Sequence, residues 1–194
     1  MNSRVEIMGV LNITDNSFYD GGKFNNLKAS IKHAKKLITD GADIIDIGAE
    51  SSKPGSNRVS SKDQIHKIEP LVEAIRDISN IPISIDTRSS EVIDHLLKYK
   101  INIVNDISSL EDKDLLDIIK HNKLFISLMH MQGTPKTMQI NPIYDNVIDD
   151  IYVYLKNRAE LCINHGIDKS NIIIDPGFGF GKTLDHNYKI LNNL

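Results

Sequence analysis

The side chains best suited to chemistry in this sequence lie where short apolar runs end. Six runs are followed directly by polar groups that could bind a ligand, namely Asn12, residues 50–53, Asp86, Asn105, His130 and Asp175. An ionised carboxylate only accepts hydrogen bonds, so Asp86 and Asp175 require a donor-rich partner. Together with the amide of Asn105 they suit a flat heterocycle that presents an exocyclic amine beside a ring N–H, as pterins and guanines do.

The same residues are also compatible with simpler structural roles. Asp86 and Asn105 could cap the helices that follow their strands. A carboxylate site for a hard metal ion is a weaker alternative, because no His and Glu at helical spacing accompany it. The sequence does not fix the distance between the carboxylates, so it does not identify an acid/base pair. Asp46 lies inside an apolar run and belongs either to the core or to the site.

A glycine-rich segment follows Asp175, with the sequence DPGFGFGKT at residues 175–183. Its ending resembles a P-loop, but that motif needs glycine where Pro176 stands, and the dinucleotide pattern fails at Lys182. The segment is either an ordinary turn or a loop whose backbone can approach a flat ligand. In the second case Phe180 would supply an apolar wall.

Further positions also suggest contacts to a ligand. Ser52 and Lys53 offer a hydroxyl and a cation to an anionic leaving group or a carboxylate. The amide oxygen of Asn12 could bind a hard cation such as Mg²⁺. Residues 12–22 are longer than a strand–helix connection needs, so they form either a flexible loop or a lid. Met129 would pack against a flat ring or within the core.

The elements that position these residues are strands and helices in alternation. The apolar runs are continuous and rich in β-branched residues, which is typical of parallel strands covered on both faces. The predicted strands are 5–11, 44–47, 81–85, 101–104, 124–129 and 172–174. Apolar residues at helical spacing predict helices over 27–39, 62–78, 91–99, 112–121 and 144–165, and a last helix after Asp185. Gly41 and Gly166 stand where helices end in the left-handed conformation.

Six such units in a row predict an α/β fold, either an open sheet or a barrel. A polar group at the end of every strand favours a (β/α)8 TIM barrel, whose sites gather at that face. A complete barrel typically needs about 250 residues, whereas this chain has 194. We therefore expect an incomplete barrel with about six βα units in a single domain, residues 1–194.

Composition narrows the class of protein further. The net charge of −3 argues against nucleic acid or an anionic membrane surface as the main partner. No apolar run approaches the roughly 20 residues that span a bilayer, and the N-terminus lacks the apolar core of a secretory signal. The only cysteine is Cys162, which excludes an internal disulfide and fits a reducing, cytoplasmic location.

Six segments, in order and spacing, resemble the signatures of the dihydropteroate synthase family: 8–22, 46–55, 84–87, 105–106, 128–139 and 175–182. The resemblance implies a TIM barrel that condenses 6-hydroxymethyl-7,8-dihydropterin diphosphate with p-aminobenzoate. The products are 7,8-dihydropteroate and pyrophosphate, in a Mg²⁺-assisted transferase step of folate biosynthesis that sulfonamides inhibit. It also implies small-molecule partners and a homodimer formed through the family's last helices.

Site roles follow from the same resemblance. The pterin ring would be held by Asp86, Asn105, Met129 and Asp175, and Asp20 and Asp175 would be the catalytic residues. Asn12 would help bind Mg²⁺ and pyrophosphate. The p-aminobenzoate and diphosphate side would be lined by Phe18, Ser52, Lys53, Pro54, Gly179 and Phe180.

Three departures from the family pattern are visible. Residues 14–18 read TDNSF where the family usually has TPDSF, and Ser52–Lys53 replace Thr-Arg, which loses a bidentate guanidinium. The Ser-Arg-Lys and Arg-x-His motifs of the family's seventh and eighth strands are missing, as are its dimer-forming helices. The resemblance thus implies a chain truncated before the last two βα units. An inactive pterin-binding fragment is one alternative, and a pterin-domain methyltransferase is another, although the loop at 52–55 argues against the latter.

Overall fold

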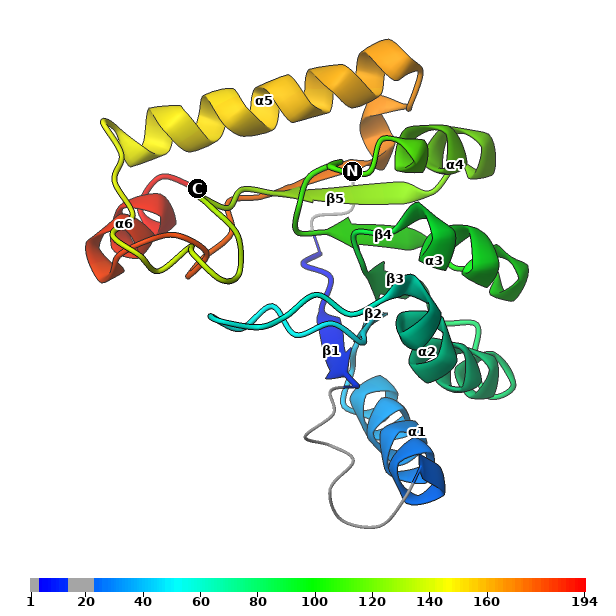
Figure 1. Cartoon of the computed structure of the whole chain (residues 1–194). Coiled ribbons are helices and arrows are strands. Elements are labelled where there is room, and N and C mark those ends of the chain that lie inside the picture. The colour runs from blue at the N-terminus through cyan, green and yellow to red at the C-terminus, as the bar shows by residue number, and fades with distance from the viewer. Residues whose placement is uncertain (1–3, 14–22) are drawn as a thin grey trace.

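A computed structural model describes residues 4–13 and 23–194 of the chain. Its centre is a six-stranded sheet in which every neighbouring pair is parallel and the spatial order follows the sequence (Figure 1). The strands are β1 (Met8–Asn12), β2 (Ile44–Gly48), β3 (Ile83–Asp86), β4 (Ile103–Asp106), β5 (Phe125–Met129) and β6 (Ile172–Asp175). The prediction of six parallel βα units is confirmed.

The helices cover the outside of the curved sheet, as parallel crossovers require (Figure 1). They are α1 (Lys23–Thr39), α2 (Ser61–Arg76), α3 (Ser90–Leu96), α4 (Asp114–Asn122), α5 (Val147–His165) and α6 (Leu184–Leu191), with 3₁₀ turns at Leu97–Tyr99 and Lys169–Asn171. The core between sheet and helices is aliphatic. Ile45, Ile47, Ile83 and Ile85 from the central strands are fully buried.

Strands β1 and β4 begin and end later in the sequence than the apolar runs that predicted them. β1 begins at Met8 rather than Val5, and β4 covers Ile103–Asp106 rather than 101–104. Val5 is 82% exposed, so its hydrophobicity does not reflect burial. Conversely, Asn105 and Asp106 pair with β5 through the backbone although both are polar. Hydrogen bonding in the ladder therefore carries each of these strands further toward its polar end than hydropathy indicates.

The predicted helix ends are confirmed by backbone geometry. Gly166 caps α5 with φ of +96°, and its N–H donates to the carbonyls of Cys162 and Ile163. Gly41 follows α1 with φ of +104°. Glycine adopts positive φ without a steric penalty, which explains its presence at both positions.

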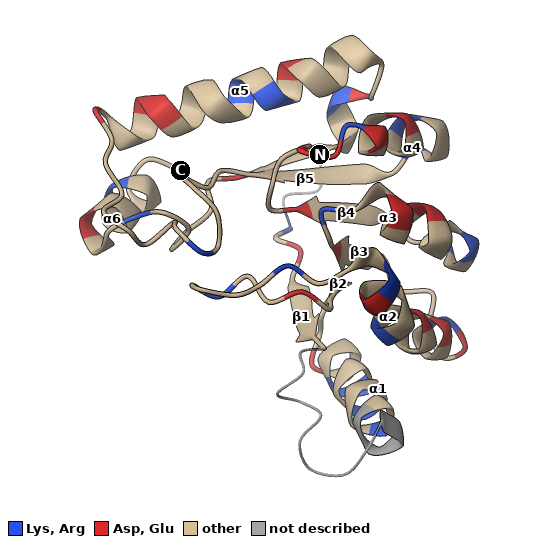
Figure 2. Ribbon diagram, viewed as in Figure 1, with Lys and Arg blue, Asp and Glu red and all other residues tan. Residues whose placement is uncertain are grey.

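Charged residues of both signs are spread over the helices (Figure 2). Helix α1 is strongly basic, with exposed Lys28, Lys32, Lys35 and Lys36. Within residues 4–13 and 23–194, no helix combines the length and the apolar character needed to cross a membrane.

Candidate functional site

The register of the sheet brings the strand-end polar groups into one row. Asn12 is paired with Gly48, Gly48 with Asp86, and Asp86 with Asn105. A Cβ atom on Gly48 would lie 2.9 Å from Asn12 Oδ1 and 3.1 Å from Asp86 Cβ. The side chains of Asn12 and Asp86 therefore occupy the space next to residue 48, and a glycine at this position leaves room for them. The predicted grouping of Asn12, Asp86 and Asn105 is thus present in the structure.

Asp46 lies one layer deeper and orients Asn105. Its Oδ2 accepts a hydrogen bond of 3.3 Å from Asn105 Nδ2. With the amide nitrogen engaged, Asn105 Oδ1 is the atom left for a ligand donor. Burial raises the pKa of Asp46, and the neighbouring Ser84 and Asn105 side chains oppose that rise. Asp46 Oδ1 and Ser84 Oγ are buried without a hydrogen-bond partner, so both atoms keep unused hydrogen-bonding capacity beneath the row of strand-end groups.

The carboxyl of Asp86 is the most strongly perturbed acid in this row. Burial raises its pKa to about 8, and the negative charges of Asp46, Glu50 and Asp106 add to the rise, while Arg88 opposes it. Near neutral pH the group is therefore poised between its protonated and ionised forms. A ligand that donates hydrogen bonds to the carboxylate would favour ionisation and release a proton.

Asp175 and Met129 form a second pair, in register on β6 and β5. Asp175 Oδ1 accepts a 2.7 Å hydrogen bond from Gly177 N–H, and the carbonyl of Asp175 accepts one of 3.0 Å from His130 N–H. Met129 is buried, and its carbonyl accepts from Ser109 Oγ at 2.7 Å. The end of β6 is consequently fixed both to its own glycine loop and to β5.

The glycine loop is held by a buried lysine that the sequence did not single out. Lys182 Nζ lies 3.0 Å from His130 Nδ1, 3.1 Å from the His130 carbonyl and 2.9 Å from the Phe180 carbonyl. Burial lowers the pKa of Lys182 to about 8, which the charge of Asp175 opposes. Burial and the Lys182 charge lower the pKa of His130 to about 4. His130 is therefore neutral at pH 7 and engaged with Lys182.

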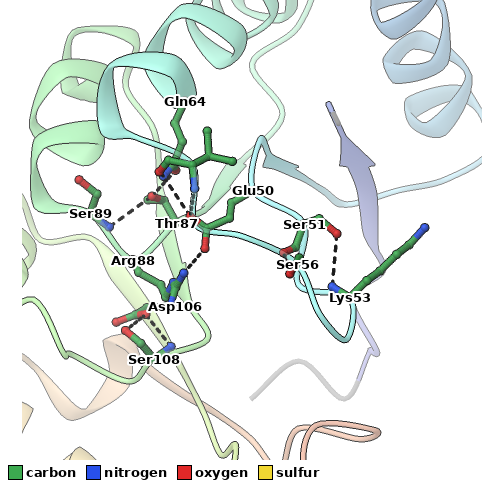
Figure 3. Close-up of polar contacts among 11 residues, drawn as sticks. Glu50, Ser51, Lys53, Ser56, Gln64, Thr87, Arg88, Ser89, Asp106 and Ser108 are labelled. Carbon is green, nitrogen blue, oxygen red and sulfur yellow. Dashed lines mark hydrogen bonds and ion pairs between the residues drawn. The ribbon is translucent and has the colours of Figure 1, made fainter. Parts of the chain in front are cut away.

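The loop after β2 extends on the same side of the molecule as the loop after β5 (Figure 1). Gly55 N–H donates to the carbonyl of Pro135 at 2.9 Å, which ties the two loops together. Ser52 is half-buried, whereas Lys53 and Pro54 are exposed. The side chain of Lys53 points away from the other labelled residues (Figure 3).

The remaining predicted residues have different positions. Gly179 is exposed, with its N–H donating to Asn187 Oδ1 at 2.8 Å and its carbonyl accepting from Gln139 Nε2 at 2.6 Å. Phe180 is half-buried beside it. Phe18 and Asp20, predicted for the p-aminobenzoate side and for catalysis, lie outside the described residues.

The charged groups behind the site were missed by sequence reasoning. Arg88, Asp106 and Lys182 were given no role of their own, and Glu50 was noted only as part of a polar run. The one available signal was a charged residue within two positions of a polar strand end, as at Arg88 after Asp86 and Asp106 after Asn105. That signal does not distinguish a buried side chain from an exposed one.

A metal ion at this site would take most of its ligands from groups other than protein side chains. No cluster of three or more His, Cys, Asp or Glu residues suited to a metal occurs in the part of the chain that the structure describes. Asn12 Oδ1 beside Asp86 offers one hard oxygen ligand. Mg²⁺ commonly binds proteins through only one or two carboxylate oxygens and completes its shell with substrate phosphates and water, and an amide oxygen is a hard ligand of the same kind. The residues present therefore fit Mg²⁺ that arrives with a phosphorylated ligand.

Comparison with known proteins agrees with this geometry. The family model described as "Pterin binding enzyme" matches residues 8–194. Dihydropteroate synthase of Escherichia coli K12 is 44% identical over 192 residues, covering 99% of this chain and 68% of that protein. The Haemophilus influenzae enzyme is 41% identical over 189 residues, covering 97% and 69%.

A solved structure shows the same arrangement. Yersinia pestis dihydropteroate synthase, in complex with a sulfonamide drug, superposes with a TM-score of 0.91 at 41% identity. The match covers 98% of this chain and 70% of that one, and it identifies the six βα units as part of a TIM barrel. The chain therefore belongs to the dihydropteroate synthase family of pterin-binding transferases.

Proposed function

We propose that this chain binds 6-hydroxymethyl-7,8-dihydropterin diphosphate and p-aminobenzoate and joins them into 7,8-dihydropteroate, with release of pyrophosphate, as a step of folate biosynthesis. The observation that carries the proposal is the row of acceptors at the strand ends. Asp86 and Asn105 Oδ1 lie side by side above Asp46, and Asp175 stands at the end of β6. Carboxylate and amide oxygens suit the amine and ring N–H groups of a pterin.

In this reaction the p-aminobenzoate nitrogen forms a bond to the exocyclic methylene carbon of the pterin. The carbon–oxygen bond to the diphosphate breaks, the diphosphate leaves with the electron pair, and the amine loses a proton. Positive charge develops on the pterin as the bond breaks. The ionised forms of Asp86 and Asp175 would stabilise that charge, because fixed carboxylates in a partly desolvated site interact strongly with it.

The other side chains of the site would orient the reactants. Asp46 holds the Asn105 amide so that its oxygen faces the ring, and buried Met129 would pack beside that ring. Asn12 would contribute an oxygen to Mg²⁺, which when bound would neutralise the leaving diphosphate. The p-aminobenzoate and diphosphate side would be lined by Ser52, Lys53, Pro54, Gly179 and Phe180.

Replacement of Asp175 by alanine tests the pterin site directly. We expect Asp175→Ala to lower pterin affinity by about 10- to 100-fold, because a charge-assisted contact to a buried ligand is lost. Titration calorimetry with 6-hydroxymethylpterin measures the affinity, and a pyrophosphate-release assay with both substrates measures turnover. Asp94→Ala, an exposed position on α3, is the matched control.

The outcomes separate the alternatives. Unchanged pterin affinity in Asp175→Ala would contradict the site assignment. Pterin binding without pyrophosphate release by the unaltered chain would support a pterin-binding protein without synthase activity.

A further inference from the structure

A largely buried ion pair lies behind the proposed site. Arg88, in the turn after β3, forms an ion pair with Glu50, in the loop after β2, and their side chains are only 12% and 11% exposed. Figure 3 shows Arg88 between Glu50 and Asp106. Desolvating two charges costs several kcal/mol per ion, so a buried pair is weak evidence for stability. A role in fixing the arrangement of the site explains it better.

Glu50 closes the base of the loop after β2. Its Oε2 accepts a 3.1 Å hydrogen bond from the N–H of Val59 at the far end of the loop, and a 3.4 Å contact from Gln64 Nε2. Gln64 Nε2 also donates to the Val59 carbonyl at 3.0 Å. Both ends of residues 50–59 are therefore gathered at one carboxylate.

The same network reaches the strands that carry the proposed pterin contacts. Thr87, directly after Asp86, donates from Oγ1 to Gln64 Oε1 at 2.7 Å and from its N–H to the Asn105 carbonyl at 3.1 Å. Thr87 and Gln64 are both buried. Glu50 and Arg88 thus connect the loop after β2 to the ends of β3 and β4.

Arg88 is also the positive charge that faces the acidic groups of the site. Besides Glu50, it interacts favourably with the carboxylates of Asp86 and Asp106. Asp46 adds a further negative charge next to Asp86. Removing Arg88 would leave the carboxylates of Glu50, Asp86 and Asp106 without this internal counter-charge. The other charged groups lining the hollow beside Arg88 are Arg58, Glu91 and Asp112.

We propose that Glu50 and Arg88 are positioning residues, which fix the p-aminobenzoate loop, residues 51–58, to the strand ends carrying Asp86 and Asn105. This inference rests on the proposed function and extends it to a pair of residues that would not touch either substrate. Its consequence is that the two substrate sides are held as one unit before any ligand binds.

The first test needs no ligand. Hydrogen exchange of the Val59 amide should accelerate by at least about 10-fold in Arg88→Met, because Glu50 is then no longer held as the acceptor. Arg88→Lys should restore part of the protection, since a point charge replaces a planar guanidinium. Lys62→Met, an exposed position on α2, is the matched control and should leave the exchange rate unchanged. Unaltered Val59 exchange in Arg88→Met would overturn the inference.

A double-mutant cycle covers the case in which Arg88→Met fails to fold. Glu50→Gln keeps an oxygen for Val59 but removes the charge, and it can be compared with Arg88→Lys and with the combination of both. If the two residues act as a pair, the effects on Val59 exchange will be smaller together than the sum of the single effects. Strictly additive effects would contradict the pairing.

The second test uses both substrates. In Arg88→Met we expect the KM for p-aminobenzoate to rise by at least about 10-fold with a smaller change in kcat, because the loop is released while the reacting groups stay in place. Pterin binding should also shift its pH dependence to higher pH, since Asp86 loses the opposing charge of Arg88. A fall in kcat alone would contradict a positioning role. If the unaltered chain fails to bind pterin or to turn over, the proposed function is refuted. The exchange result would still stand, because it is measured without any ligand.

Discussion

At the scale of single residues, the site depends on a carboxylate that is costly to ionise. Asp86 is surrounded by Asp46, Glu50 and Asp106, with Arg88 as the opposing charge. In such surroundings the Asp86 carboxyl is either protonated or has its negative charge compensated by a ligand. Asp46 serves a different purpose, because its contact with Asn105 Nδ2 decides which amide atom faces the site.

The affinity for a pterin should therefore depend on pH. Burial and the neighbouring acids raise the pKa of Asp86 to about 8. If the ligand binds the ionised form, affinity will rise between pH 6 and 8, by at most about tenfold per pH unit, and level off above. Calorimetry in buffers of different ionisation enthalpy should show proton release on binding. Asp86→Asn should remove both effects, and a pH-independent affinity of the unaltered chain would contradict this assignment.

Glycine at position 48 is required by two side chains rather than by backbone conformation. We expect Gly48→Ala to weaken pterin binding, because the new Cβ would lie 2.9 Å from Asn12 Oδ1 and 3.1 Å from Asp86 Cβ. Gly9→Ala is the matched control, since its Cβ would meet apolar neighbours at 3.2 to 3.4 Å, away from the site. Both variants should lose about 1–3 kcal/mol of stability through overpacking. Only Gly48→Ala should change the affinity, and an equal affinity in both variants would count against the role of residue 48.

At the scale of elements, the loops after β5 and β6 act as one body. In addition to the Lys182 contacts, the hydroxyl of Tyr144 donates a 2.6 Å hydrogen bond to the Gly181 carbonyl. The side-chain amide of Gln139 donates to the Gly179 carbonyl. A Cβ on Gly181 would lie 2.6 Å from the carbonyl oxygen of Gln132, so glycine permits this close approach. The wall that Phe180 would contribute is thereby fixed to β5 as well as to β6.

Removing the buried ammonium should loosen this pair of loops. Lys182→Met would leave the carbonyls of His130 and Phe180 without their donor, which we expect to cost about 1–3 kcal/mol in the free energy of unfolding. Urea unfolding measures that loss. Calorimetry with p-aminobenzoate should show weaker binding. Lys189→Met, exposed on α6, is the matched control; the same stability in both variants would show that the contacts of Lys182 contribute nothing.

At the scale of the whole molecule, the buried ionisable groups make stability depend on pH. Asp86 has a pKa of about 8 in the folded state, above the value of about 3.9 for an unfolded chain. The folded state therefore binds more protons, and the free energy of unfolding falls as pH rises through this range. His130 has the opposite effect below its unfolded value of about 6.5, because its folded pKa is about 4.

Between pH 6.5 and 8 the contribution of Asp86 should dominate over that of His130. We expect the free energy of unfolding to decrease across this window and the decrease to be smaller in Asp86→Asn. Above pH 8 the slope should weaken, because Lys182, with a folded pKa of about 8, favours the folded state as pH rises toward about 10.4. Urea unfolding at half-unit pH steps measures the profile. A slope equal in the two proteins would refute the buried ionisation of Asp86.

Much of this molecule follows from the sequence by itself. Continuous β-branched runs that alternate with helical patterns determine six parallel βα units, and polar residues at the strand ends place Asn12, Asp86, Asn105 and Asp175 at one edge. These features are local or periodic, so they are visible without knowing which residues meet. The order of the six signatures also identified the family.

The tertiary structure alone decided how those groups are connected. Burial of Arg88, Glu50 and Lys182, the contact between Asp46 and Asn105, and the shared space over Gly48 all join residues far apart in the chain. A charged residue looks the same in the sequence whether it is exposed or buried. Its partner and its pKa arise only when the register of the sheet and the closing of the loops determine which charges leave water together.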